Sequence, residues 1–171
     1  DEELLWTAMM GSAIASSIIA RHTKLADPEA AFIGGLLHDV GRVYLINEHP
    51  DVFKRAPLPA ERGQCPPELD FTMRQAGAMI VKKWGFPETL QTVLKNFDNP
   101  DELVKERYIY NLVTIITLAD RICLTLGIGC ALRGGQYPPQ GGIAMESQMT
   151  NLSDSLGINE RGLKKLVENI R

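Results

Sequence analysis

The stretch Ala31-Phe-Ile-Gly-Gly-Leu-Leu-His-Asp-Val-Gly-Arg42 places a histidine beside an aspartate inside an apolar segment. Ionisable neighbours such as His38 and Asp39 are unusual there, because a buried charge is costly unless it is paired or bound to a metal. The pair therefore indicates either a metal site or a hydrogen-bonded structural pair. The rest of the sequence has to distinguish these two alternatives.

The segments on both sides of this pair have the apolar periodicity of α-helices, and none alternates as a half-buried strand does. Asp27 is a predicted N-cap, because Pro28 follows it at the first helical position and an acid lies in the first turn. The helix that begins there is predicted to pass through His38-Asp39 and to reach Ile46. Further helices are predicted over residues 3–22, 68–84, 87–97 and 103–126, with a short continuation over 47–55 and a polar loop over 56–67.

The β-branched run Val113-Thr114-Ile115-Ile116-Thr117 would also suit a strand, but flanking helix formers and the length of the segment favour a helix. Residues 127–142, rich in Gly and Pro, are predicted to form a long surface loop or a flap. Two short helices close the chain, and Asn159 is the predicted cap of the last one. The sequence thus predicts an all-α, single-domain helical bundle, with a core over 1–126 and C-terminal helices over 143–171.

The composition is that of a globular domain of 171 residues, 44% hydrophobic and 23% charged. The formal net charge of −3, without a basic run, gives no reason to expect nucleic-acid binding. No apolar stretch is judged long enough to span a bilayer and no cleavable leader is recognised, so a cytoplasmic protein without a membrane partner is expected. Because the chain begins at Asp1 in a helical pattern, a natural segment is expected to precede it.

The cysteines Cys65, Cys123 and Cys130 are odd in number and widely spaced. A disulfide framework would need an even set, and a structural zinc site would need a Cys-x-x-Cys pair. Reduced and mostly buried thiols are therefore predicted.

Other catalytic motifs are not found in the sequence. Gly34-Gly35 and Gly41 lack the preceding strand and the Lys-Ser/Thr pair of a phosphate-binding loop, so close helix packing is predicted for them. No Gly-x-Ser-x-Gly nucleophile elbow occurs. The histidine-aspartate pair remains the feature with chemical interest.

The segment Gly35-Leu-Leu-His-Asp-Val-Gly41 resembles the signature of the HD superfamily, helical metal-dependent phosphohydrolases named for that dipeptide. Further matching blocks are Leu5-Trp6, Ala31-Phe32-Ile33-Gly34-Gly35, Ala76-Gly77-Ala78, Lys83-Trp84-Gly85-Phe86-Pro87 and Thr117-Leu118-Ala119-Asp120-Arg121. Together they resemble the HDOD domain, an HD-related output domain of bacterial signalling proteins. The resemblance covers residues 5 to about 125 and implies a helical bundle of the HD type.

The chain departs from the hydrolytic pattern at the positions of the additional histidines that the resemblance implies. It has Ala8-Met9 where an early His is expected, Met73 where a second often stands, and Asn96-Phe97 where a His or a His pair is common. His22 and His49 do not replace them, because each lies near a predicted helix end and is expected to be exposed. Only the set His38, Asp39 and Asp120 remains.

Two interpretations of this set follow. In the first, buried Asp39 and Asp120 accept hydrogen bonds from His38, Arg42, Arg121 or backbone amides in a structural polar cluster, with no catalytic residue and no cofactor. In the second, His38, Asp39 and Asp120 are the ligands of a weakly bound divalent metal. The missing imidazoles favour the first, because a single imidazole with two carboxylates orients a metal-bound nucleophile poorly.

The resemblance implies a non-catalytic regulatory module of bacterial signal transduction, with receiver, GGDEF or EAL-type proteins as partners. The alternative is a metal-dependent phosphohydrolase of nucleotides or cyclic nucleotides that uses His38, Asp39 and Asp120. A third reading is a nucleotide or small-molecule sensor without the chemistry. Any ligand groove is expected beside His38 and Asp120, with the 127–142 loop as its lid.

Overall fold

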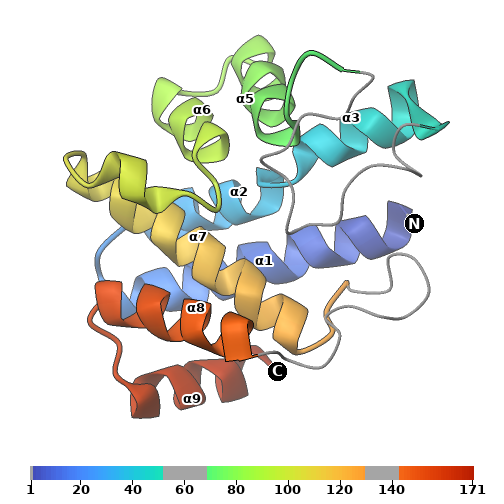
Figure 1. Cartoon of the computed structure of the whole chain (residues 1–171). Coiled ribbons are helices and arrows are strands. Elements are labelled where there is room, and N and C mark those ends of the chain that lie inside the picture. Colours follow the sequence, from blue (N-terminus) through green and yellow to red (C-terminus); the bar gives the residue numbers. More distant parts are fainter. Residues whose placement is uncertain (1, 52–68, 130–142) are drawn as a thin grey trace.

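The computed structural model describes residues 2–51, 69–129 and 143–171, and all regular structure within these ranges is helical (Figure 1). The elements are α1 (Glu2–Thr23), α2 (Pro28–Leu37), α3 (Val40–Glu48), α5 (Met73–Lys83), α6 (Glu88–Lys95), the short 3₁₀ helix η2 (Pro100–Leu103), α7 (Arg107–Thr125), α8 (Ile143–Ser155) and α9 (Glu160–Ile170). The prediction of an all-α, single-domain bundle is confirmed. The β-branched run 113–117 lies inside α7, so the strand alternative for it is wrong.

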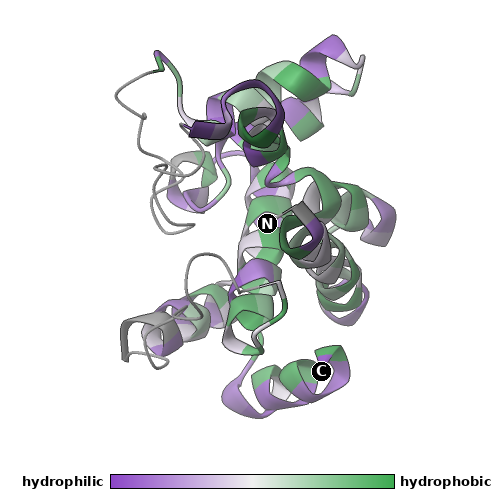
Figure 2. Cartoon of the chain, turned by 90° about the vertical axis from the view of Figure 1, so that its right-hand side faces the viewer, coloured by the Kyte–Doolittle hydropathy of each residue, from purple (hydrophilic) through white to green (hydrophobic). Residues whose placement is uncertain are grey.

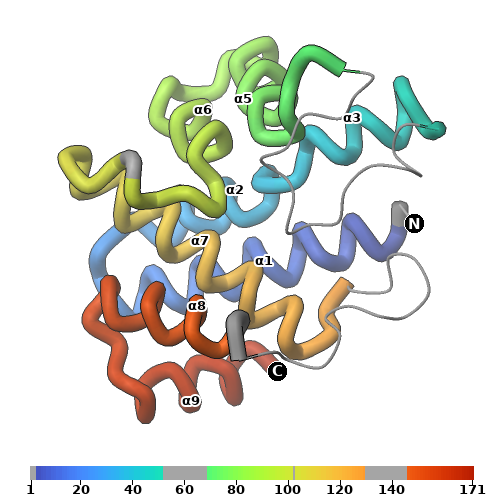
Figure 3. Tube along the Cα trace, in the orientation of Figure 1, coloured from blue at the N-terminus to red at the C-terminus, as the bar shows by residue number. Residues whose placement is uncertain are grey.

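The helix α7 forms the centre of the bundle. It crosses in front of α1, with α5 and α6 above it and α8 and α9 below it in the views of Figures 1 and 3. Every residue from Asn111 to Leu124 is buried, the polar Asp120 and Arg121 included, so this helix has no side that faces solvent over that stretch. Of the surrounding helices, α6 and α9 have one hydrophobic and one hydrophilic side, whereas α2 is apolar apart from Glu29. Figure 2 shows hydrophobic and hydrophilic residues along the helices.

The length and composition of two helices would allow them to span a bilayer, over Glu3–Thr23 and Arg107–Thr125. The expectation that no stretch approaches this length is therefore wrong. The apolar composition of α7 follows from its central position, because 78% of its most apolar window is buried inside the protein. In α1 the buried share of the corresponding window is 44%. The absence of a membrane partner stays a prediction.

Close packing between α1, α2 and α7 depends on small residues, as predicted for Gly34-Gly35. A Cβ atom on Gly35 would lie 2.7 Å from the Ser12 carbonyl oxygen and 2.9 Å from the Ala13 Cα. A Cβ on Gly34 would overlap the Ile116 side chain. These contacts place the C-terminal end of α2, and hence His38, directly against the core.

The predicted single helix from Pro28 to Ile46 is wrong at its middle. The helix α2 ends at Leu37, and α3 begins at Val40, with a turn at His38 and Asp39 between them. Past the turn, α3 packs on α5 so closely that a Cβ on Gly41 would overlap the Met73 carbonyl group. Tertiary contact after the turn thus sets a direction for α3 that a continuous helix would not have.

The predicted caps at two helix starts are confirmed. The Asp27 carboxylate accepts a hydrogen bond from the Ala30 amide at 3.1 Å, and the Asn159 side chain accepts one from the Gly162 amide at 2.9 Å.

Two predicted starts are wrong. The helix predicted from residue 68 begins at Met73, because Thr72 and Gln75 form a capping box there. The helix predicted from residue 103 begins at Arg107, because Pro100–Leu103 forms a separate turn of 3₁₀ helix.

Several predictions fall wholly or partly outside the described residues. These are the end of the 47–55 continuation, the loop over 56–67, residues 130–142 of the predicted flap, Cys65 and Cys130. Within the described ranges, Cys123 is buried, as predicted.

Candidate functional site around His38 and Asp120

The centre of the candidate site is a contact between the end of α2 and the middle of α7. His38 and Asp120 are 5% and 2% exposed, and the His38 Nε2 lies 3.3 Å from the Asp120 Oδ1. The His38 Nδ1 lies 2.6 Å from the Gly35 carbonyl oxygen. Because a carbonyl oxygen only accepts, the Nδ1 carries the hydrogen and donates it, which fixes the ring with its Nε2 towards α7.

The neighbouring aspartate has a different partner. The Asp39 Oδ2 lies 3.5 Å from the Arg42 Nη1, one turn further along α3, and both residues are buried. Asp39 occupies the N-cap position of α3, although its side chain accepts no hydrogen bond from the backbone of that helix. The turn between α2 and α3 therefore separates the two side chains, so that His38 faces α7 and Asp39 faces Arg42.

A second arginine extends the cluster along α7. Arg121 donates a hydrogen bond to the Asp98 Oδ1 at 2.8 Å, and its Nη1 lies 3.7 Å from the Asp120 Oδ2. Asp98 has a left-handed backbone (φ 67°), and its amide donates to the Thr117 Oγ1 at 3.4 Å. The Asp120 carboxylate is thus placed between an imidazole on one side and a guanidinium group on the other.

An aromatic side chain covers the imidazole. Phe97 is 1% exposed, and its ring centre lies 4.8 Å from that of His38. Its carbonyl oxygen accepts a hydrogen bond from the Arg74 Nη1 at 2.7 Å, which holds the segment after α6 against α5. Phe97 occupies a position where the resemblance implies a histidine, and it supplies apolar surface there instead of a lone pair.

The other substituted positions are also part of the core. Met9 is 3% exposed and Met73 is 8% exposed, and each packs among apolar residues. The histidines elsewhere in the chain stay apart from the cluster. His22 is exposed at the end of α1, as predicted. The same prediction is wrong for His49, which is half-buried at the end of α3 because its ring packs beside Tyr44.

These residues do not fit the divalent metal of a hydrolytic HD centre. His38 and Asp120 could act as two ligands, but the third candidate, Asp39, faces the cationic Arg42. A second guanidinium group, that of Arg121, stands beside Asp120, and both would repel a dication. Among the described residues, no group of three or more His, Cys, Asp or Glu side chains is arranged to hold a metal ion.

The residues of the predicted polar cluster do lie together, but Arg42 and Arg121 approach Asp39 and Asp120 as ion pairs at 3.5 and 3.7 Å, longer than ordinary hydrogen bonds. The sequence did not point to Phe97, Asp98 or Arg74 as part of it. The only sequence signal for Asp98 was its place in the turn Asn96-Phe97-Asp98-Asn99, which indicates a loop but not the loop's distant partner.

The predicted ligand groove beside His38 and Asp120 has little surface to offer, since their side chains are 1% and 3% exposed. A cavity of about 810 Å³ lies instead between α3 and α5.

A family model for the HDOD domain matches residues 1–100. Three solved structures share the fold. A response regulator, MmoQ from Methylococcus capsulatus str. Bath, has 22% identity and a TM-score of 0.71, over 98% of this chain and 62% of its own. A candidate phosphohydrolase from Shewanella amazonensis SB2B has 20% identity and a TM-score of 0.65, over 97% of this chain and 58% of its own. An HDOD domain protein with unknown function from Geobacter sulfurreducens has 20% identity and a TM-score of 0.63, over 99% of this chain and 58% of its own.

The chain therefore spans about three fifths of the length of these solved relatives. No curated protein sequence matches it.

Proposed function

Because this chain belongs to the HDOD domain family, we propose that it is a regulatory module of signal transduction without hydrolytic activity of its own. It acts through the packing of its helices or by binding another protein, such as a receiver, GGDEF or EAL-type protein, in the bacterial cytoplasm. The presence of a response regulator among the solved structures with this fold supports a role in signal transduction.

The observation that carries the proposal is the pairing of the two candidate metal-ligand carboxylates with arginines. Asp39 faces Arg42, and Asp120 lies between His38 and Arg121. A hydrolytic centre needs carboxylates that are free to bind a cation and an open position for water. Here protein cations lie beside both carboxylates, and the Phe97 ring lies against the imidazole.

Metal content and hydrolysis test the proposal. The chain is purified without chelator, its metal content is measured by mass spectrometry, and hydrolysis of bis(p-nitrophenyl) phosphate and of cyclic nucleotides is assayed with and without added Mn²⁺. We expect substoichiometric metal and no hydrolysis above the rate without protein. His22→Ala serves as the matched control for His38→Ala, because it removes an exposed imidazole far from the cluster.

A stoichiometric transition metal in the wild-type protein, together with hydrolysis that disappears in His38→Ala and persists in His22→Ala, would overturn the proposal. Because His38→Ala changes the core, His38→Gln is measured in parallel, and circular dichroism verifies the fold of each variant. The metal content and activity of the wild-type protein are decisive even if neither variant folds.

A further inference from the structure

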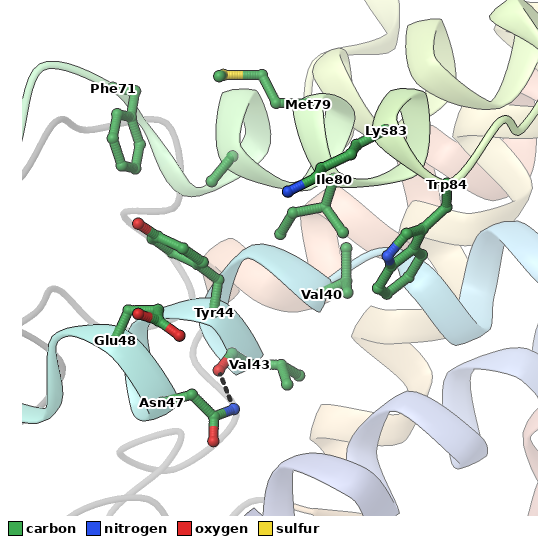
Figure 4. Close-up of a pocket in the computed structure, with 11 residues that line it drawn as sticks. Val40, Val43, Tyr44, Asn47, Glu48, Phe71, Met79, Ile80, Lys83 and Trp84 are labelled. Carbon is green, nitrogen blue, oxygen red and sulfur yellow. Dashed lines mark hydrogen bonds between the residues drawn. The ribbon is translucent and has the colours of Figure 1, made fainter.

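A cavity of about 810 Å³ lies between α3 and α5, on a side of α3 that the His38 cluster does not use (Figure 4). Its lining residues follow one face of each helix: Val40, Val43, Tyr44, Asn47 and Glu48 from α3, Ala76, Met79, Ile80, Lys83 and Trp84 from α5, and Phe71 from the segment before α5. Both helices contribute positions i, i+3, i+4, i+7 and i+8, the spacing of a helix face that packs against something.

The size of this cavity indicates what it can hold. Each lining stripe covers nine residues, so the groove is about 12 Å long at the rise of an α-helix. In Figure 4, Phe71 stands at one end of the groove and Trp84 at the other. A groove of two turns with a ring at each end is short for a docked helix, whereas its volume lies in the range of small-molecule sites.

The chemistry of the lining is apolar and aromatic. Tyr44, Phe71 and Trp84 supply three rings around the cavity. Trp84 is 57% exposed and Met79 is 64% exposed, so large apolar side chains face water at this groove. An aromatic ligand would remove this apolar surface from water and would stack on the aromatic rings, and each of these effects favours binding.

Two charges determine the orientation of such a ligand. Figure 4 shows the Lys83 ammonium group over the groove, and the Glu48 carboxylate on the opposite helix near Tyr44. Within the described part of the chain, Lys83 forms no ion pair, so its charge is available to a ligand. An anionic group is attracted to Lys83 and repelled from Glu48, so it would bind on the α5 side.

We propose that the cavity between α3 and α5 binds a small organic anion: an aromatic or otherwise apolar body of roughly the groove's length that carries one carboxylate, sulfonate or phosphate group for Lys83. The apolar body lies between Val43 and Ile80, with Trp84 against one end. The site is independent of the chemistry at His38, so it stands or fails separately from the absence of hydrolysis.

The binding of two dyes of matched shape tests this inference. Anilinonaphthalene sulfonate carries an anionic group, and phenylnaphthylamine has the same ring system without it. We expect both dyes to bind the folded chain saturably with one site, and the anionic dye to bind more tightly. Lys83→Met should weaken only the anionic dye, by about threefold to fivefold, as expected for a partly exposed ion pair.

Neighbouring residues provide the controls. Lys82→Met removes a neighbouring exposed charge that does not line the cavity, and it should change the affinity of neither dye. Trp84→Ala should weaken both dyes at least tenfold. Trp6→Ala removes a tryptophan with the same exposed fraction, 57%, from α1 outside the cavity, and it should leave both affinities unchanged.

Three results would overturn the inference: no saturable binding of either dye, equal effects of Lys82→Met and Lys83→Met, or equal effects of the two tryptophan variants. Sedimentation of the wild-type chain gives a further check. A dimer that dissociates in Trp84→Ala would identify the groove as a contact between copies of this chain and would also overturn the small-molecule assignment.

Discussion

The His38 Nε2 and the Asp120 Oδ1 lie 3.3 Å apart, and this contact joins the end of α2 to the middle of α7. Asp39, the next residue after His38, contacts Arg42 of α3 instead. A dipeptide that would supply two ligands to one metal thus forms two separate buried pairs. Each ionisable group lies beside another that would be costly to bury alone, so the removal of one partner is expected to destabilise the fold.

Asp120→Asn should destabilise the fold. The substitution keeps the shape of the side chain but removes the charge that faces His38 and Arg121 inside the protein. We expect the free energy of unfolding to fall by about 3 kcal/mol, as for other buried pairs that lose one partner. Urea unfolding followed by circular dichroism measures the change.

The control for this prediction is Asp154→Asn, the same chemical change at an exposed position of α8. It should alter the unfolding free energy by less than about 0.5 kcal/mol. If both substitutions lowered the unfolding free energy equally, the contact of Asp120 with His38 and Arg121 would have no specific effect on stability.

Gly41→Ala and Gly77→Ala should have opposite effects, although both add one methyl group to a buried helix position. At Gly41 the new Cβ would overlap the Met73 carbonyl, so the backbones of α3 and α5 must separate, at a cost of about 3 kcal/mol. At Gly77 the nearest atom, Val40 Cγ1, lies at an ordinary 3.4 Å. Higher helix propensity should then stabilise the protein by about 0.5–1 kcal/mol. Thermal unfolding of both variants gives the comparison, and destabilisation by Gly77→Ala would contradict it.

Asp98 should respond differently to Asn and to Ala. Asn tolerates the left-handed backbone at φ 67° and loses only the charge that pairs with Arg121, for an expected loss of about 1 kcal/mol. Ala loses the hydrogen bond and also lacks the short polar side chain that lets Asp and Asn tolerate the left-handed region, which costs an ordinary residue about 1–2 kcal/mol. Asp98→Ala should therefore be the less stable of the two in urea. Equal midpoints for the two variants would show that the backbone conformation carries no cost.

Asp27→Ala should cost about 1 kcal/mol, because the Ala30 amide loses its N-cap acceptor. Asp27→Ser retains an acceptor at the same position and should keep most of the stability. Differential scanning calorimetry at one pH measures both transitions. A Ser variant as unstable as the Ala variant would mean that the negative charge of Asp27, rather than its hydrogen bond, stabilises the start of α2.

The helical class and most helices could be predicted because they depend on local periodicity. The caps Asp27 and Asn159 could also be predicted, since a cap acts on amides only a few residues away. The break at residues 38–39 could not, because helical periodicity continues through it and the close approach of Gly41 to Met73 just beyond it joins residues distant in sequence. The predicted start of α7 is also too early, because the segment Pro100–Leu103 has the composition of a helix start but forms a separate 3₁₀ turn.

The members of the polar cluster were easier to predict than their pairing. His38, Asp39 and Asp120 stand out as ionisable residues among apolar ones, and Arg42 and Arg121 lie close to them in sequence. The turn after α2 determines the pairing of each carboxylate with its cation. Helical periodicity does not reveal that turn. Phe97 is an ordinary core residue by its sequence, and only the fold shows its ring against His38.

The turn at residues 38–39 also has a mechanical consequence. One side of the peptide bond is fastened to α7 through His38, and the other side is fastened to α3 through Asp39 and Arg42. The α3–α5 pair therefore meets the α1–α2–α7 body at this turn, in addition to the hydrogen bond from Arg74 of α5 to the Phe97 carbonyl. A displacement of α3 relative to α7 would therefore change the surroundings of both ionisable side chains of the dipeptide at once.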